Sequence, residues 1–197
     1  MNLLEEQLHS AGLQVVDHCE RLATYSPDLL EHSPLLEDFT AAEADVLAAS
    51  MLLVRAAPGQ VLIREGDAGD WMMLILKGTV DVTKRIELRA GNGDGDALSA
   101  TANHAEPDAV EFTESRVAVL QRGAAIGEMS MLDSGLRYTT CTAIEAVEAG
   151  VLGSHAIGLL IRDHPGVGAK LLVKITQLMA QRLRNISNQL VKSLQKA

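Results

Sequence analysis

The stretch PGQVLIREGDAGDWMMLILKGTVDV, residues 58–82, consists of short apolar runs divided by glycine and proline turns. The runs lie at 61–63, 71–76 and 80–82. Short apolar runs between such turns are typical of an antiparallel sandwich or barrel. The stretch therefore predicts a mainly β domain.

The same pattern extends outward from this stretch. Further strands are predicted at 51–54, 117–120, 125–126, 138–143 and 146–152. Apolar spacing and start signals predict helices over 3–24, from Ser33-Pro34, over 41–49, over 156–163 and from 166 to the C-terminus. We expect a mainly β fold with flanking helices: an antiparallel, jelly-roll-like β-roll with N-terminal helices and a long C-terminal helix.

The predicted organisation has three parts. Residues 1–32 form an N-terminal helical extension, residues 33–165 the β-roll with its short helices, and residues 166–197 the long helix. Within the β-roll, residues 86–116 are rich in Gly, Asn and Asp, so they are expected to form a mobile hairpin loop.

This loop contains a partial calcium-binding pattern. Asn92, Asp94 and Asp96 alternate as the first ligands of an EF-hand loop do, but Ala97 and Asn103 stand where that loop needs Gly and Glu. A mobile loop is therefore preferred to a calcium site.

Composition restricts the class of protein. The net charge of −9, from 26 acidic and 17 basic residues, argues against a nucleic-acid binder, which needs clustered Lys and Arg. Cys19 and Cys141 are too few for a disulfide scaffold and are expected to be buried, reduced thiols. The N-terminus has no signal-peptide pattern and no run approaches a membrane span, so we expect a soluble, cytoplasmic protein.

The segment IGEMSMLDSGLRYTT, residues 126–140 and called the cassette below, has the pattern of a ligand site. It is predicted to form a strand, a short helical turn, a loop and a strand. Gly127 allows close approach to the backbone. The N–H groups of Met129 and Ser130 lie at the start of the turn, where unpaired donors favour an anion.

Two charged side chains complete this pattern. The planar guanidinium of Arg137 can hold two phosphate oxygens at once, and Glu128 is an acceptor suited to a sugar hydroxyl. A carboxylate and a guanidinium beside free backbone donors indicate a sugar-phosphate site. A surface salt bridge between the two is the less favoured interpretation.

The cassette resembles that of the cyclic nucleotide-binding domain found in bacterial catabolite activator proteins and in regulatory subunits of protein kinase A. That family has Gly-Glu-(Leu/Ile)-(Ala/Gly)-Leu, a loop, and Arg-(Ala/Ser/Thr)-Ala, where this chain has Gly127 to Met131 and Arg137 to Thr139. Residues 58–67 and 75–78 resemble the family's first hairpins, and the resemblance covers about residues 35–195.

The resemblance implies a role for each matching residue. Glu128 would accept the ribose 2′-hydroxyl, Arg137 would pair with the exocyclic phosphate oxygens, and the backbone at Met129 and Ser130 would donate to the same phosphate. The ligand would be cAMP or cGMP, with no cofactor and no metal. The candidate ligand-binding residues are Gly127, Glu128, Met129, Ser130, Arg137, Tyr138, Thr139 and Ser187.

Tyr138 departs from the family pattern, because a small residue normally follows the Arg. We expect its ring either to project into the pocket and crowd the ligand or to stack on the nucleotide. A Thr at this position is associated with cGMP preference in the family, and Tyr138 does not supply it. Thr139 replaces the usual Ala.

The C-terminal helix has two apolar stripes. One, with coiled-coil spacing, predicts a homodimer seam and comprises Leu172, Met179, Leu183, Ile186 and Leu190. The other can face the β-roll and comprises Leu171, Ile175 and Leu178. The resemblance supports dimerisation and implies that Ser187 reaches the purine, from its own subunit or from the partner's. Ile186 replaces a polar residue in that region.

The same helix carries basic residues and no acidic ones from residue 170 onward: Lys170, Lys174, Arg182, Arg184, Lys192 and Lys196. A membrane surface or an acidic partner is one interpretation. A solvated face is preferred.

Three functions follow as hypotheses. The first is a cyclic nucleotide sensor, with cAMP as ligand, that acts through an unknown partner or a dimer rearrangement. The second is a dimeric interaction scaffold that has lost its ligand because Tyr138 fills the pocket. The third, a metal-dependent barrel enzyme, is disfavoured because the histidines are scattered over predicted helices and loops: His9, His18, His32, His104, His155 and His164.

The end of the chain also bears on function. Because Ala197 follows the long helix directly, we expect that the DNA-binding domain of the catabolite activators is not present. We expect a stand-alone sensor that is not an enzyme, does not bind DNA directly and does not span a membrane.

Overall fold

The computed structural model describes residues 3–19, 21–25, 28–88 and 111–195. Within these ranges the strands form two antiparallel sheets, of order β1-β2-β9-β4-β7 and β3-β8-β5-β6. The strands are β1 Gln14–His18, β2 Leu52–Ala56, β3 Val61–Ile63, β4 Trp71–Lys77, β5 Thr79–Leu88, β6 Glu111–Gln121, β7 Ala125–Ile126, β8 Thr140–Ala143 and β9 Val147–Gly153.

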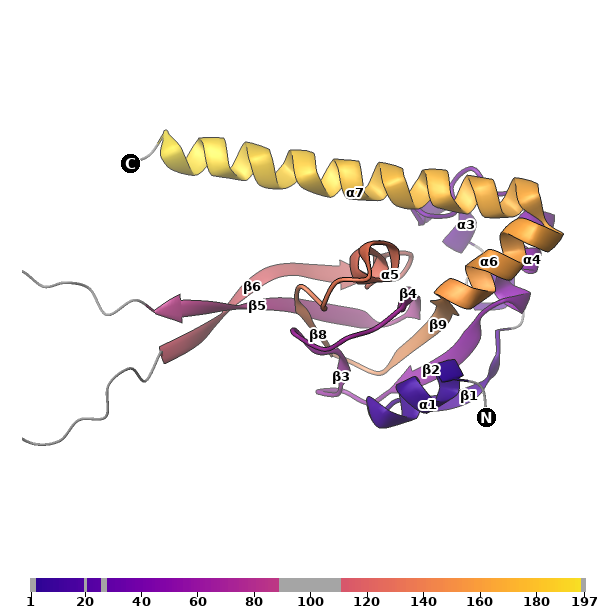
Figure 1. Cartoon of the computed structure of the whole chain (residues 1–197), viewed down its shortest axis with the longest axis horizontal. Helices are drawn as coiled ribbons and strands as arrows, with labels where there is room; N and C mark the ends of the chain where they lie inside the picture. Colours follow the sequence, from indigo (N-terminus) through magenta and orange to yellow (C-terminus); the bar gives the residue numbers. More distant parts are fainter. Residues whose placement is uncertain (1–2, 20, 26–27, 89–110, 196–197) are drawn as a thin grey trace, which may run out of the picture.

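Helices flank the sheets, and α7 extends along the upper side of the molecule as drawn in Figure 1. They are α1 Leu3–Ser10, α2 Leu22–Tyr25, α3 Leu29–His32, α4 Ala41–Ala49, α5 Glu128–Asp133, α6 Ser154–Asp163 and α7 Pro165–Leu194. The predicted antiparallel β-roll with flanking helices and a long C-terminal helix is confirmed.

Strand β4 explains why residues 71–76 are continuously apolar. Its alternate side chains enter two different cores, so both of its faces are buried. Met72, Leu74 and Leu76 pack in a core shared with the helices. Trp71, Met73 and Ile75 pack in the inter-sheet core, which comprises Leu8, Leu13, Leu52, Val54, Ala56, Leu62, Ile63, Trp71, Met73, Ile75, Val80, Val82, Ile126, Cys141, Ala143, Val147, Ala149 and Val151.

The predicted helix over 3–24 is confirmed over 3–10, as α1, and again from Leu22, as α2, but it is wrong over 11–18. Gly12 has a φ of +77°, and the N–H groups of Gly12 and Leu13 donate to the carbonyls of His9 and Leu8. These are the two bonds of a Schellman motif, which ends a helix at a left-handed glycine. The chain then forms β1, which pairs with β2 at the edge of the first sheet.

The helix predicted from Ser33-Pro34 is also wrong, because residues 34–38 form turns. The buried Ser33 hydroxyl instead donates to the carbonyl of Gly123 at 2.7 Å. The helix predicted over 41–49 is confirmed as α4. Thr40 and Glu43 form its capping box, in which each side chain accepts from the other residue's N–H.

The predicted loop over 86–116 is wrong at both ends. Residues 86–88 belong to β5 and residues 111–116 to β6, which pair in antiparallel register. Residues 89–110, with Asn92, Asp94 and Asp96, lie outside the described residues. The polar composition of the segment hid these strand ends, which leave the body of the domain as a two-stranded ribbon (Figure 1).

Two lysines join the first half of α7 to α4 and to the turns before it, so the predicted solvated basic face is wrong there. Lys170 donates to Glu43 at 2.7 Å. Lys174, whose side chain is 4% exposed, pairs with Glu37 at 2.8 Å and with Asp38. Leu171 and Ile175, which follow these two lysines, are buried in the core shared with the helices. This agrees with the prediction that their stripe faces the domain.

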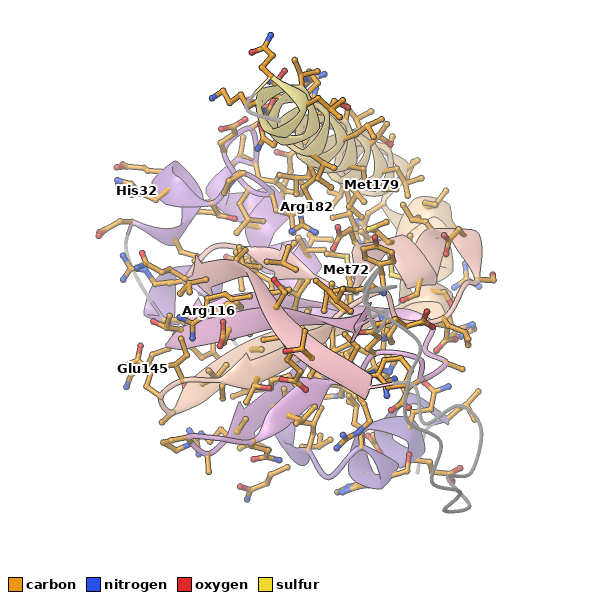
Figure 2. All side chains as sticks on the ribbon, turned by 90° about the vertical axis from the view of Figure 1, so that its left-hand side faces the viewer. His32, Met72, Arg116, Glu145, Met179 and Arg182 are labelled. Atoms are coloured by element: carbon orange, nitrogen blue, oxygen red, sulfur yellow. The ribbon has the colours of Figure 1, made fainter. Side chains whose placement is uncertain are left out.

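Beyond Arg182, α7 extends away from the domain. Leu183 and Ile186 are 67% and 58% exposed, and Leu194 is 69% exposed. Before that point, Met179 and Arg182 point from α7 toward the sheets (Figure 2). The helix therefore has a docked half and an uncovered apolar half.

The Glu43 ion pair predicts a loss of stability in acid. The Lys170 ammonium, with hydrogen bonds from Thr40, lowers the pKa of the Glu43 carboxyl from 4.5 to about 2. A carboxyl whose pKa is lower in the folded state stabilises the fold above pH 4.5 and loses this contribution as pH falls toward 2. Glu43→Gln keeps the capping box but loses the charge.

We expect the difference in free energy of unfolding between wild type and Glu43→Gln, measured by urea titration, to shrink as pH falls from about 6 toward 2. Glu31→Gln, at an exposed position, is the control. A difference that stays constant over this pH range would contradict a role for the Glu43 charge.

Candidate ligand-binding site

Gly127 begins the helical part of the cassette. It precedes α5 in the left-handed conformation, with a φ of +79°. A Cβ at this position would lie 2.7 Å from Nη1 of Arg137 and 2.9 Å from Cδ1 of Ile63. Only glycine fits, but the group that approaches its backbone closely is the arginine of the same cassette.

Arg137 is buried at the centre of the site, with 4% of its surface exposed. Its Nη1 donates to the carbonyl of Gly127 at 2.7 Å and to Oγ of Ser130 at 2.6 Å, and its Nη2 donates to the carbonyl of Trp71 at 2.8 Å. Its Cζ lies 4.1 Å from the centroid of the Trp71 ring. Burial lowers the pKa of this guanidinium below its ordinary value.

Glu128 is 1% exposed, and it faces α7. Its Oε1 pairs with Nη1 of Arg182, whose Nη2 also donates to the carbonyl of Ala125 at 2.6 Å. Its Oε2 is buried and has no hydrogen-bond partner among the described residues. A buried acceptor without a donor is costly, so Oε2 of Glu128 is a candidate acceptor for a donor from outside the chain.

Sequence reasoning counted Arg182 only among the basic residues of the helix. A signal was nevertheless present, since Arg182 follows Ile175 by seven positions and Leu178 by four. These are residues of the stripe predicted to face the β-roll, and residues at this spacing share a helix face.

Tyr138 is turned to the surface, which corrects the expectation that its ring projects inward and crowds the pocket. Its side chain is 61% exposed. Nζ of Lys84 lies 4.0 Å from its ring centroid and donates to its carbonyl at 2.7 Å and to Glu65 at 2.8 Å. Because neighbouring residues in an extended segment point in opposite directions, the inward Arg137 turns Tyr138 outward.

Of the four remaining candidate residues, two are at least partly buried and two are exposed. Ser130 is buried beside Arg137, and Thr139 is half-buried and hydrogen bonded to Cys141. Met129 is 41% exposed, although its N–H lies in the first turn of α5. Ser187 is exposed on the uncovered half of α7.

Both cysteines are buried free thiols, as predicted. Burial raises the pKa of Cys19 to about 12 and the pKa of Cys141 to about 11. Such thiols stay protonated at neutral pH and are poor nucleophiles.

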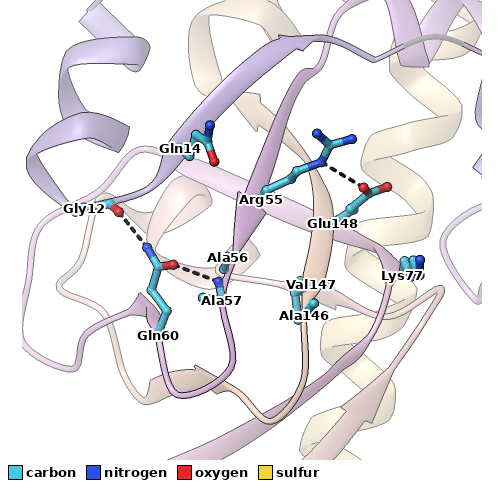
Figure 3. A pocket seen from close by; sticks show the side chains of 10 residues that line it. All are labelled: Gly12, Gln14, Arg55, Ala56, Ala57, Gln60, Lys77, Ala146, Val147 and Glu148. Carbon is cyan, nitrogen blue, oxygen red and sulfur yellow. Dashed lines mark hydrogen bonds and ion pairs between the residues drawn. The ribbon is translucent and has the colours of Figure 1, made fainter.

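Two of the cavities of the described residues adjoin the sheets. One, of about 270 Å³, is lined by Arg137 and Trp71 together with residues of α1 and of the segment after β3. The other, of about 300 Å³, lies beside β2 and β9 (Figure 3). There the polar groups bind one another: Gln60 joins Gly12 and Ala57, and Arg55 pairs with Glu148 at 2.9 Å. The first cavity is the one that adjoins the cassette.

The described residues show neither a metal-ligand cluster nor a membrane-spanning helix. No three His, Cys, Asp or Glu side chains among them gather as metal ligands would. In the same part of the chain, no helix has the length and apolar character needed to cross a bilayer.

Solved structures of other proteins share the fold described above. A cyclic nucleotide-binding domain from Methylobacillus flagellatus superposes with a TM-score of 0.69 and 27% identity, over 91% of this chain and 89% of that one. The chain has the fold of a cyclic nucleotide-binding domain. The catabolite activator protein of Thermus thermophilus matches with a TM-score of 0.61 and 25% identity, over 80% of this chain and 62% of that one.

Curated relatives carry the same domain. This chain is 26% identical, over 132 residues or 67% of its length, to a CRP-like cAMP-activated global transcriptional regulator of Mycobacterium tuberculosis. It is equally similar, over the same share of its length, to a cAMP-dependent protein kinase regulatory subunit of Yarrowia lipolytica. The chain spans 47% and 28% of the length of these two relatives. No family model matches it. The cyclic nucleotide-binding fold thus rests on the structural match and on these relatives.

Proposed function

We propose that this chain binds a cyclic mononucleotide, cAMP before cGMP, and acts as a regulatory domain without enzymatic activity of its own. The observation that carries the proposal is the buried pair of Arg137 and Glu128 on one cassette, with Oε2 of Glu128 unpartnered. The choice of cAMP is supported by the names of the relatives in M. tuberculosis and Y. lipolytica. The buried, protonated thiols fit a reducing cytoplasm, where we place the protein.

The proposed ligand would use each polar group of the cassette. Oε2 of Glu128 would accept the ribose hydroxyl, which supplies the donor that this atom lacks. Arg137 and the N–H groups of Met129 and Ser130 would hold the phosphate. A phosphate supplies oxygens for all of these donors at once.

The proposed output passes through α7. Arg182 joins this helix to Glu128, the residue that would bind the ribose. A ligand that favours the docked position of Arg182 would stabilise the docked helix, which is a shift between two populations. A partner protein or a second copy of the chain would respond to the position of the helix.

Isothermal titration calorimetry of the whole chain with cAMP and with cGMP tests the proposal. Saturable binding of cAMP, tighter than that of cGMP, would support it. Tighter binding of cGMP would change the ligand within the same function. No binding of either nucleotide would reject the function.

The uncovered half of α7 leads us to propose a homodimer. Leu183 and Ile186, on the stripe with coiled-coil spacing, are more than half exposed. We expect Leu183→Glu and Ile186→Glu to convert a dimer into monomers, as measured by light scattering after size exclusion. Val173→Glu changes an apolar residue that is 54% exposed and lies outside that stripe, and it is expected to stay dimeric. A monomeric wild type would contradict the seam.

The position of Tyr138 gives a further prediction, which bears on the scaffold alternative. The Tyr138 ring is exposed and lies over Lys84. Exposed contacts of charged side chains contribute little free energy, so we expect Tyr138→Ala to change nucleotide affinity by less than about threefold. If wild type fails to bind and Tyr138→Ala binds in the same calorimetric titration, the scaffold alternative is correct instead.

A further inference from the structure

We propose that Trp71, the Ser130 hydroxyl and Gly69 position Arg137, so that the Nε–Nη2 edge of its guanidinium faces the ligand phosphate. The proposal rests on the proposed function, since it concerns the same arginine. It adds three residues to the site that the cassette pattern does not assign in these roles.

The hydrogen bonds of Arg137 leave one edge of the guanidinium available. Of the five N–H donors that a guanidinium carries, both on Nη1 are used, by Gly127 and Ser130, and one on Nη2 is used by Trp71. Among the residues that the structure describes, Nε–H and the second Nη2–H have no acceptor. These two N–H groups can lie parallel, which is the geometry that binds two phosphate oxygens.

Gly69 lies beside that same edge. A Cβ at Gly69 would stand 2.5 Å from Nη2, 2.8 Å from Nε and 2.9 Å from Cζ of Arg137. Even a methyl group would therefore collide with the edge that has free donors. The absence of a side chain keeps this edge unobstructed, while Gly127 does the same for Nη1 on the other side.

Trp71 and Ser130 fix the orientation of the guanidinium. The Trp71 ring, which is 5% exposed, lies 4.1 Å from Cζ, and the Ser130 hydroxyl accepts from Nη1 at 2.6 Å. A guanidinium held before the ligand arrives loses less entropy when it binds. The 270 Å³ cavity lined by Arg137 and Trp71 provides space beside it.

Two substitutions test this arrangement in calorimetric titrations with cAMP. Ser130→Ala removes one acceptor that orients Arg137 and is expected to weaken binding by about threefold to tenfold. Gly69→Ala is expected to weaken it more than about tenfold, since its methyl group would displace the guanidinium. Gly158→Ala is the matched control, because a Cβ at Gly158 meets nothing within 4 Å. Wild-type affinity in both test variants would overturn the proposal.

A second measurement needs no ligand. Trp71 is the one tryptophan of the chain, so intrinsic fluorescence reports on its ring alone. We expect Arg137→Met and Ser130→Ala to change the emission in the same direction, and Gly158→Ala to leave it unchanged. Emission unaffected by Arg137→Met would overturn the stacking on which the proposal depends.

The two measurements separate this proposal from the proposed function. If wild type binds cAMP and the Gly69 and Ser130 variants bind equally well, the positioning is wrong and the function stands. If wild type binds neither nucleotide, the proposed function is wrong, and so is the proposal that the Nε–Nη2 edge of Arg137 faces a ligand phosphate. The fluorescence of Arg137→Met and Ser130→Ala then decides whether Trp71 and Ser130 position the guanidinium.

Discussion

Arg137→Ala is expected to weaken cyclic nucleotide binding by about 100-fold or more, which removes it from the range of ordinary calorimetric titration. The reason is the loss of the two charge-assisted hydrogen bonds proposed for the Nε–Nη2 edge, each contributing about 1.5–3 kcal/mol. The buried guanidinium also joins the cassette to β4 through the Trp71 carbonyl. The thermal midpoint of the variant should therefore fall as well.

The fold and the ligand must be measured separately for this variant. Circular dichroism establishes a temperature at which Arg137→Ala is folded, and the titration is made there. Arg137→Lys keeps the charge but loses the planar fork, so we expect it to bind weakly too. Arg116→Ala is the control, since Arg116 is exposed and pairs with Asp81 outside the cassette. Wild-type affinity of Arg137→Ala would show that the cassette does not bind the phosphate.

Arg182→Ala is expected to lower the free energy of unfolding by about 2 kcal/mol. It leaves the Glu128 carboxylate, 1% exposed, without its cationic partner. Removing one member of a fully buried pair costs about 3–5 kcal/mol, and we take a smaller value because Arg182 is 37% exposed and partly solvated. Urea unfolding of the two proteins at pH 7 measures the difference.

A double-mutant cycle isolates this ion pair. Glu128→Gln removes the charge that Arg182→Ala strands, so the double variant should be more stable than the sum of the single effects allows. Arg184→Ala is the matched control, because Arg184 is exposed and bonds only Gln181 among the described residues. Additive effects of the two changes would mean that α7 and the cassette are not joined through this pair.

The fold was predictable where glycine and proline mark the turns. As the pattern indicated, Pro58-Gly59 separates β2 from β3, and Lys77-Gly78 marks the turn from β4 to β5. Proline restricts the backbone and glycine frees it, so such turns can be recognised locally. The N-terminus was not predictable in this way. Its apolar spacing continues through Gly12, and only the pairing of β1 with β2, which depends on a distant part of the chain, makes residues 14–18 a strand.

The site divides along the same line. Glu128 and Arg137 were found because they lie on one contiguous segment whose local pattern carries the chemistry. The partners of these two residues come from elsewhere: Arg182 is 54 positions from Glu128, and Trp71 is 66 positions from Arg137. Local patterns contain no information on such pairs, so neither the ion pair nor the stacking was predicted. The direction of Tyr138 follows from the inward Arg137 and was missed for the same reason.

The N-terminal strand limits where this domain can be shortened. Strand β1 covers the hydrogen-bonding edge of β2, and Leu8 and Leu13 before it are almost completely buried in the inter-sheet core. A chain that began at residue 33, the start of the predicted β-roll, would leave β2 as a bare edge above an open apolar face. Bare strand edges recruit strands of other molecules, and so a fragment designed on the sequence boundary would be prone to aggregate. We therefore expect residues 3–19 to limit self-association of the domain as well as completing its sheet.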